Sequence, residues 1–259
     1  MAPTLTRNGT KTDHISRRLQ IEPASRWVRV QFNDQLIADT KKALLVRDGH
    51  HLTYYFPLED VTMDWLQSSR IGGDGRQYYD IVVDGRSAES AAWTYFDSQD
   101  DFASLGGYLA FNWRKMDHWF EEEEEVFVHP RDPYHRVDAI QSSRSIRIVI
   151  DGVAVAESQR PVLLFETGLP VRYYLPQEDI RMELLTSSRA NTDCPYKGTA
   201  SYWNVNISGD NCRNIVWGYL EPIDEVQKIA GLLCFFNEKV DVYVDGELEQ
   251  KPETLWSKD

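Results

Sequence analysis

The sequence predicts a mainly β protein made of two tandem copies of one small antiparallel domain, each with at most one short helix. Three observations support this prediction: an internal repeat, short stretches of alternating apolar residues, and Asp-Gly pairs at hairpin positions. The 259 residues are enough for two domains of ordinary size, each with a hydrophobic core of its own.

The repeat consists of matching segments that keep their order along the chain. Three pairs are YYFPLEDV at 54–61 and YYLPQEDI at 173–180, QSSR at 67–70 and TSSR at 186–189, and WTY at 93–95 and WGY at 217–219. Chance does not produce ordered matches at nearly constant spacing, so we infer a duplication followed by small insertions.

The individual elements are clearest in the second copy. Residues 146–150 (IRIVI) alternate, Asp151-Gly152 is a hairpin turn signal, and residues 153–156 resume the strand. Further strand candidates, rich in β-branched and aromatic residues, are 162–165, 172–175, 200–207, 214–219 and 239–244. A short helix is expected at 223–233, where apolar residues recur at helical spacing.

These patterns divide the chain into five segments: a polar tail at 1–25, a degenerate first repeat at 26–112, an ordered connector at 113–145, an intact second repeat at 146–250 and a tail at 251–259. The connector combines large apolar side chains with five consecutive glutamates at 121–125. We expect Trp113, Met116, Trp119 and Phe120 to be buried and the glutamates to lie largely in water.

Composition excludes several classes of function. The net charge of −13 argues against nucleic acid and against anionic membranes as partners. Three cysteines without a C-x-x-C pair, and connector histidines at wide spacing, predict neither a disulfide framework nor a metal site. There is no phosphate loop and no dinucleotide fingerprint, so no cofactor is expected. The absence of a leader-like segment or a long apolar run predicts a cytoplasmic protein.

One loop distinguishes the two copies. The second copy has NTDCPYKG at 191–198, whereas the first has only IGGDGRQ at 71–77. The loop places a thiol (Cys194), a phenol (Tyr196) and an ammonium group (Lys197) beside a glycine, where backbone can approach a ligand closely. The alternative is that Cys194 and Tyr196 pack in the core while Lys197 lies on the surface.

A candidate acid or base follows the strand at 162–165. Glu166, whose counterpart in the first copy is Asp48, could transfer protons if it lies at a strand end near aromatic walls. The alternative is a turn residue that faces solvent. Cys194 is a possible nucleophile, although no histidine is adjacent to it in sequence.

Four aromatic residues complete the candidate site. Trp217 and Tyr219 are two apart on one strand, so they face the same side and could form one wall of a pocket. Tyr173 and Trp203 are further ligand-binding candidates. All four could instead belong to the core.

The second copy resembles a known family in four segments: ETGLPVRYYLPQEDI at 166–180, CPYKGTASYWNV at 194–205, WGYLEP at 217–222 and FFNEKVDVYVDG at 235–246. They are similar to the domain-of-unknown-function 427 family, sometimes labelled nucleotidyltransferase-like. The tandem arrangement resembles two-copy members, although the first copy lacks CPYKG. The resemblance implies a small antiparallel β domain, tent- or barrel-like, and it implies no particular reaction.

The nucleotidyltransferase label is the least favoured hypothesis. Metal-dependent nucleotidyl transfer needs paired carboxylates beside the phosphates. Glu178-Asp179 is such a pair, yet Glu59-Asp60 matches it in the degenerate copy, so a turn is the simpler role for both.

The leading hypothesis is that the second repeat binds a small anionic or phenolic metabolite. Lys197 would supply the contact to the anion and Glu166 the proton transfer, and with Tyr196 they are the catalytic candidates. Aromatic walls would come from Tyr173, Tyr196, Trp217 and Tyr219, with Cys194 and Trp203 as further ligand-binding candidates. If the protein is an enzyme, cofactor-free isomerisation, cyclisation or hydration fits these residue types. The alternative is a non-catalytic protein-interaction module that uses the acidic connector and exposed aromatic residues.

Overall fold

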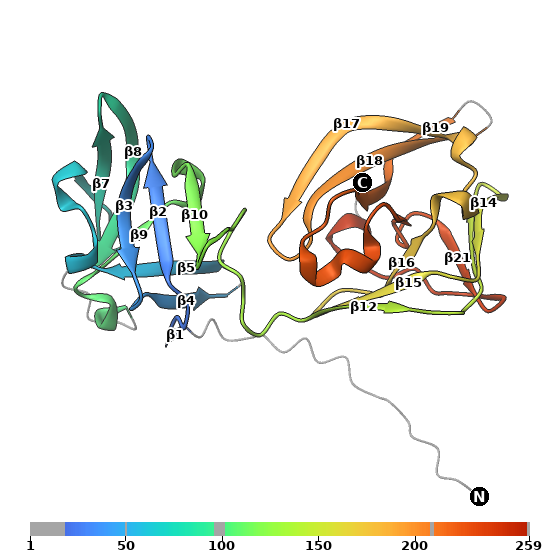
Figure 1. The fold of residues 1–259 in the computed structure, drawn as a ribbon, viewed down its shortest axis with the longest axis horizontal. Coiled ribbons are helices and arrows are strands. Elements are labelled where there is room, and N and C mark those ends of the chain that lie inside the picture. Colours follow the sequence, from blue (N-terminus) through green and yellow to red (C-terminus); the bar gives the residue numbers. More distant parts are fainter. Residues whose placement is uncertain (1–18, 50, 96–101, 208–209, 258–259) are drawn as a thin grey trace, which may run out of the picture. The chain divides into compact units, whose positions relative to one another are not determined.

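The computed structural model describes residues 19–49, 51–95, 102–207 and 210–257. The chain divides between Glu125 and Val126 into two compact units, here called the first unit and the second unit (Figure 1). Each unit contains one seven-stranded and one four-stranded sheet, and all strand pairs within these sheets are antiparallel.

In the first unit the large sheet has the order β1-β4-β5-β9-β8-β7-β6 and the small sheet the order β11-β10-β2-β3. The strands are β1 (Gln20–Pro23), β2 (Val28–Phe32), β3 (Gln35–Thr40), β4 (Leu44–Asp48), β5 (His51–Pro57), β6 (Leu66–Ile71), β7 (Arg76–Val83), β8 (Arg86–Tyr95), β9 (Tyr108–Phe111), β10 (His118–Glu121) and β11 (Glu124–Glu125).

In the second unit the orders are β12-β15-β16-β20-β19-β18-β17 and β14-β13-β21-β22. The strands are β12 (Val137–Gln141), β13 (Ile146–Ile150), β14 (Val153–Ser158), β15 (Val162–Glu166), β16 (Arg172–Leu175), β17 (Leu185–Cys194), β18 (Gly198–Ile207), β19 (Asp210–Tyr219), β20 (Leu233–Phe235), β21 (Asp241–Val244) and β22 (Glu247–Leu248). Figure 1 shows β17, β18 and β19 as a strongly curved layer of the large sheet.

Strand for strand, the two units have the same topology, which confirms the predicted pair of antiparallel β domains. The sheets remain open in both units, so neither unit is a closed barrel. In the β13–β14 hairpin, Asp151 and Gly152 both adopt left-handed backbone conformations (φ 47° and 78°), as a tight two-residue turn requires.

Helical structure in the described residues is limited to short 3-10 segments. They are η1 (Leu58–Asp60), η2 (Met63–Trp65), η3 (Ala103–Leu105), η4 (Trp113–Lys115), η5 (Gln177–Asp179), η6 (Met182–Leu184), η7 (Asp224–Ile229) and η8 (Leu255–Ser257). The helix expected at 223–233 is η7, which is interrupted inside by a kink at Val226 (φ −124°, ψ 26°) and ends before Ala230, whose backbone is not helical (φ −55°, ψ 121°). None of the helices in the described part of the chain is long and apolar enough to cross a membrane.

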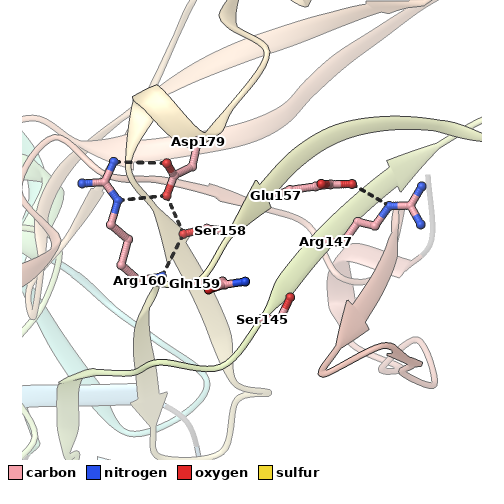
Figure 2. Close-up of a pocket in the computed structure, with 7 residues that line it drawn as sticks. All are labelled: Ser145, Arg147, Glu157, Ser158, Gln159, Arg160 and Asp179. Carbon is pink, nitrogen blue, oxygen red and sulfur yellow. Dashed lines mark hydrogen bonds and ion pairs between the residues drawn. The ribbon is translucent and has the colours of Figure 1, made fainter.

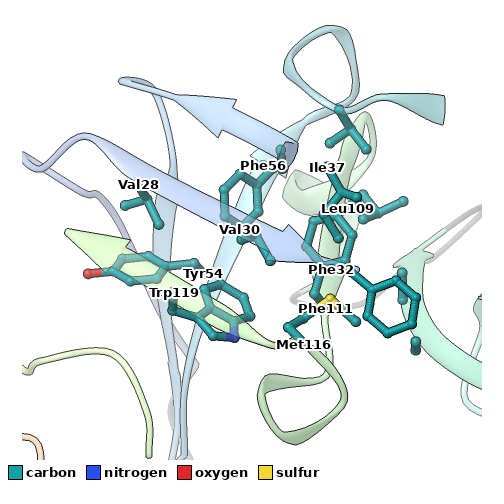
Figure 3. Close-up of a cluster of buried hydrophobic side chains, with 14 of the residues drawn as sticks. Val28, Val30, Phe32, Ile37, Tyr54, Phe56, Leu109, Phe111, Met116 and Trp119 are labelled. Atoms are coloured by element: carbon teal, nitrogen blue, oxygen red, sulfur yellow. The ribbon is translucent and has the colours of Figure 1, made fainter. Parts of the chain in front are cut away.

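The main core of each unit lies between its two sheets. In the first unit it includes Val30, Phe56, Phe111 and Trp119, which Figure 3 shows gathered between strands of both sheets. The rings of Phe56 and Phe111 meet edge to face, with centroids 5.5 Å apart. Because each large apolar side chain contributes about 1.5–3 kcal/mol on burial, these clusters stabilise each unit by itself.

The segment expected to be a connector is divided between the units. Residues 113–125 form η4, β10 and β11 of the first unit, whereas residues 137–141 form β12, the edge strand of the second unit's large sheet. Met116 and Trp119 are buried, and Trp113 stacks on Trp119 with ring centroids 4.2 Å apart.

The run of glutamates is not uniformly in water, which corrects one expectation. Residues 122–124 are exposed, but Glu121 is only 6 % exposed. It accepts a hydrogen bond from the Tyr54 hydroxyl (2.8 Å) and pairs with Arg26. Side chains alternate along β10, so Glu121 points to the same buried side as Trp119. The contacts with Tyr54 and Arg26 compensate the cost of burying its carboxylate.

The predicted tails also differ from plain polar segments. Of the tail expected at 1–25, residues 1–18 lie outside the described residues, and Gln20–Pro23 form β1 on the edge of the first large sheet. At the other end, η8 packs its tryptophan against the second unit, with the rings of Trp256 and Phe236 6.2 Å apart.

Candidate functional site

A cavity of about 330 Å³ lies in the second unit. It is on the face of the large sheet opposite the two-sheet core, because its walls use Leu164 and Tyr174 while their chain neighbours Leu163 and Tyr173 belong to that core. Six aromatic residues line it: Tyr174, Tyr202, Trp217, Tyr219, Phe236 and Trp256. A hollow of this size and composition suits a small ring-bearing molecule.

The register of the strands explains why the aromatic rings converge. Tyr202 on β18 lies directly opposite Trp217 on β19, so both project from the same face of the sheet. Tyr174 on β16 reaches the same face, and the Trp217 Nε1–H donates to its hydroxyl over 3.1 Å. This bond fixes the indole plane at the centre of the wall.

Lys197 and Glu166 form a buried ion pair at the cavity. The Nζ of Lys197 donates to Oε2 of Glu166 over 2.5 Å, and the two side chains are 9 % and 7 % exposed. Both residues line the cavity. Removing two charges from water is costly, so such a pair persists only where the charges satisfy each other.

The turn between β17 and β18 holds Lys197 in place. Its backbone N–H donates to Cys194 O (3.3 Å) and its carbonyl accepts from the Ile223 N–H (3.2 Å). Gly198 follows with φ +96°, a conformation that favours glycine. Backbone hydrogen bonds to Cys194 and Ile223 therefore hold Lys197, in the loop that differs between the two copies, in a fixed position.

Glu166 has a second partner on the side away from Lys197. Its Oε1 lies 3.0 Å from Nε2 of His135, and the His135 ring stacks on Tyr196 with centroids 4.1 Å apart. Tyr196 accepts a hydrogen bond from the Asp132 N–H through its hydroxyl (2.8 Å). These two rings border a separate depression of about 540 Å³, which also includes Arg131.

A second buried ion pair lies at the floor of the cavity. The guanidinium of Arg172 donates to both carboxylate oxygens of Glu238 (2.7 Å each), and both residues are buried. The rings of Trp217, Phe236 and Trp256 lie 5.4–5.8 Å from the guanidinium carbon. The cation–π contacts tie the C-terminal segment to the cavity floor.

This pairing determines the charge states of the two groups. Burial alone would lower the pKa of Arg172, but the hydrogen bonds and charge of Glu238 raise it. Burial likewise acts to raise the pKa of Glu238, yet the hydrogen bonds from Arg172 and Thr254 outweigh it and lower that pKa. Both groups remain ionised near neutral pH.

The buried phenols and one thiol remain neutral. Burial raises the pKa of Tyr174 and of Tyr219 well above the ordinary value, and the neighbouring Cys194 and Glu166 raise that of Tyr219 further. Burial also raises the pKa of the Cys234 thiol to about 12. The two phenols therefore stay protonated near neutral pH and can donate a hydrogen bond.

The cavity brings together five of the residues singled out in the sequence: Glu166, Cys194, Lys197, Trp217 and Tyr219. Three others lie elsewhere. Tyr196 faces the second depression, and Tyr173 and Trp203 pack against the two-sheet core. The Tyr173 hydroxyl donates to Glu249 over 2.7 Å. Because neighbouring residues of a strand face opposite sides, Tyr174 and Tyr202 occupy the positions expected for Tyr173 and Trp203.

Several cavity residues were not anticipated. Tyr202 lies directly opposite Trp217 on the neighbouring strand. It could have been found in the predicted strand at 200–207 only if the register of that strand with Trp217 had been known. No sequence signal marked Arg172, whose counterpart by strand register is Thr53. Trp256, which lines the cavity, lies in the segment expected to be a tail. His135, which lines the outer depression, lies in the segment expected to be a connector, so no sequence pattern placed either residue beside the loop.

In the first unit, side chains lie against the matching aromatic rings. Tyr55, Trp93 and Tyr95 repeat the aromatic wall, and Phe102 stacks on Tyr95 with ring centroids 4.6 Å apart. Arg76, which pairs with Tyr95 as Ala200 pairs with Tyr219, donates from Nε to the Tyr95 hydroxyl (2.8 Å). A bulky cation thus stands where the second unit has alanine.

A third, open depression of about 580 Å³ is lined by polar residues of the second unit (Figure 2). Figure 2 shows Arg160 and Ser158 beside the carboxylate of Asp179. The Ser158 hydroxyl donates to that carboxylate over 2.7 Å. The first unit has the matching bond from Thr40 to Asp60 (2.6 Å). Since both units retain this hydrogen bond, we infer that the acidic pair Glu178-Asp179 stabilises a turn through Asp179.

The fold and the cavity define a class of protein: a tandem, mainly β chain of two open two-sheet units, with a charged aromatic cavity in the second. The chain belongs to the family of the domain of unknown function DUF427, whose model matches residues 20–122 and 138–246, one match in each unit. This confirms the resemblance inferred from the sequence. Among curated proteins, no sequence matches the chain.

Proposed function

We propose that the second unit binds a small planar anion or phenol in the aromatic cavity, and that the protein is a cytoplasmic metabolite-binding protein. The observation that carries the proposal is the buried Lys197–Glu166 pair at the wall of an aromatic hollow of about 330 Å³. Its partner is a metabolite rather than nucleic acid or membrane, in keeping with the net charge of −13.

Each wall of the cavity has a role in the proposal. The ring of the ligand lies against Trp217 and Tyr202, which supply apolar area without flexible side chains. The anionic oxygen is directed to the ammonium of Lys197, the one lysine that lines the cavity among the described residues. Glu166 is within reach of the same oxygen because it touches that ammonium.

The same geometry supports cofactor-free acid–base chemistry, of the isomerase, cyclase or hydratase kind. In such a reaction Glu166 removes or returns a proton while Lys197 stabilises the oxyanion that forms. The neutral hydroxyls of Tyr174 and Tyr219 add hydrogen-bond donors near the ring. The contrast with the first unit, where Arg76 lies against the matching Tyr95 ring, supports placing the proposed site in the second unit.

The test uses 2,4-dinitrophenol, a phenol that is fully ionised at neutral pH and quenches tryptophan fluorescence. The full-length protein should bind it saturably, and Lys197→Met should weaken binding by about tenfold or more, because it removes a charge-assisted contact. The matched control is Lys228→Met, which removes an exposed lysine of the same unit. Circular dichroism should show that both variants remain folded.

Equal affinity in the two variants would contradict the proposal. Failure of the wild-type protein to bind the probe, together with failure to bind other small aromatic anions, would favour the alternative of an interaction module.

A further inference from the structure

Glu166 spans the wall between two separate hollows of the second unit. One of its oxygens contacts Lys197, which lines the aromatic cavity, and the other contacts His135, which lines the outer depression. The His135 side chain is 19 % exposed, whereas those of Glu166 and Lys197 are 7 % and 9 % exposed. A single buried carboxylate thus connects the candidate ligand site to an imidazole that is partly open to solvent.

The hydrogen bonds fix where the histidine carries its proton. An ionised carboxylate only accepts hydrogen bonds, and the ammonium of Lys197 already donates to its Oε2. Nε2 of His135 must therefore donate to Oε1, so the neutral ring carries its proton on Nε2. In this tautomer Nδ1 carries no proton and is the ring nitrogen to which a second proton would bind.

The charges around the cavity leave little positive charge for an anionic ligand. Lys197 is neutralised by Glu166 and Arg172 by Glu238, while Asp193 adds a negative charge at the rim. An anion added to this wall increases the negative charge in a partly buried site. A proton on His135, in direct contact with Glu166, is the nearest available compensation.

The other charged groups near His135 are already paired. Arg131 lies 3.2 Å from Glu225, and Arg136 lies 2.8 Å from Asp138. The phenol ring of Tyr196 covers one face of the imidazole. Within the described residues, Glu166 is the carboxylate in direct contact with the ring, so the charge of His135 acts on the cavity through Glu166.

We propose that the ligand binds as its anion and that binding is coupled to protonation of His135 at Nδ1. This inference rests on the proposed function and specifies its ligand class, a weak acid of the phenol or enol type. For a neutral phenol the balance is one proton lost from the ligand oxygen and one gained by His135, with no net exchange with solvent. His135 is a positioning residue, because it acts on the ligand through Glu166.

The first experiment follows 2,4-dinitrophenolate affinity from about pH 6 to about pH 8.5, the range in which histidines titrate. In the wild-type protein the affinity should fall roughly threefold to tenfold as the imidazolium is lost. In His135→Asn it should stay constant and equal the wild-type value at the alkaline end. A wild-type affinity that does not change with pH, or a variant that keeps the full dependence, overturns the coupling.

The second experiment needs no ligand. Nitrogen NMR of the imidazole rings at alkaline pH should show His135 with its proton on Nε2. His129 is the internal reference: its Nδ1 lies 2.7 Å from the Pro130 carbonyl, which only accepts, so it should show the opposite tautomer. His135→Asn and His129→Asn variants assign the signals.

The two experiments separate the possible failures. An Nδ1 proton on His135 overturns the inference whatever the ligand result. The expected tautomer without any dinitrophenolate binding by the wild-type protein overturns the proposed function, and with it the ligand coupling, while the Glu166–His135 arrangement stands. Binding without pH dependence overturns the coupling alone.

Discussion

Trp217 donates a hydrogen bond from its indole nitrogen to the hydroxyl of Tyr174 over 3.1 Å, and Trp93 donates the same bond to Tyr55 over 3.1 Å in the first unit. This shared bond belongs to the scaffold, because it is retained where the loop chemistry is lost. The two units differ in what surrounds the bond. The second unit adds Lys197 and Arg172, each paired with a buried glutamate.

Breaking the floor of the cavity should destabilise the second unit. Arg172→Met leaves the carboxylate of Glu238 buried without its partner, so the free energy of unfolding should fall by about 3–5 kcal/mol. Urea unfolding followed by circular dichroism measures the change. The control is Arg136→Met, which removes an arginine that is 80 % exposed and should cost about 0–1 kcal/mol. Equal losses in the two variants would show that the buried pair contributes no more than a surface pair.

The sequence predicted the class of fold because the fold depends on patterns that survive duplication. Alternating apolar residues and the Asp151-Gly152 turn specify strands and hairpins locally. Whether each sheet closes depends on long-range strand pairing, which no local pattern contains. The short helix at 223–233 was expected from apolar spacing that suits an α-helix, but the backbone there forms 3-10 turns interrupted at Val226 and leaves the helical region at Ala230.

Differences in sequence between the two copies identified cavity residues better than the positions of aromatic residues did. The CPYKG loop led to Lys197 and Cys194, both of which line the cavity. Tyr173 packs in the two-sheet core, and its neighbour Tyr174 lines the cavity instead. Which of the two faces the cavity depends on which side of the strand is buried in the core, and this is set by tertiary packing. His135 and Trp256 reach the site only through tertiary folding, from positions 62 and 59 residues away from Lys197 by number.

Acid should reveal the contribution of Glu238. Its pKa is lowered in the folded protein: burial opposes this, but the hydrogen bonds from Arg172 and Thr254 outweigh it. A lowered folded pKa gives stability that is present above the ordinary carboxyl pKa of about 4.3 and is lost as pH falls through the folded value. The difference in melting temperature between wild type and Glu238→Gln should therefore be full at neutral pH and shrink below about pH 4.

The control for this acid effect is Glu178→Gln, which removes a carboxylate that is 76 % exposed. It should change the melting temperature little at any pH. A difference between wild type and Glu238→Gln that stays constant down to strongly acidic pH would contradict the assignment of the buried pair.

Gly198 should be needed for both stability and ligand binding. Its φ of +96° lies beyond the left-handed region that alanine tolerates, and an added Cβ would lie 3.4 Å from the Glu221 carbonyl oxygen. Gly198→Ala should cost roughly 1–3 kcal/mol and displace Lys197, so dinitrophenolate affinity should fall as well. Gly231→Ala, at φ +70° with open space around it, should cost less and leave the affinity unchanged. Identical affinities in both variants would show that the turn does not position Lys197.

The C-terminal segment should contribute to ligand affinity more than to stability. Trp256 lines the cavity but remains 38 % exposed, and its ring lies 5.5 Å from the Arg172 guanidinium carbon. Trp256→Ala removes one aromatic wall, so dinitrophenolate affinity in a fluorescence titration should fall by about threefold to tenfold, the size of one aromatic contact. The melting temperature should change little, because the side chain is not part of the buried core.

Leu255→Ala is the matched control: it alters the adjacent residue, which is 91 % exposed and does not line the cavity. If both variants bind the probe as tightly as the wild-type protein, then η8 is not a wall of the ligand site.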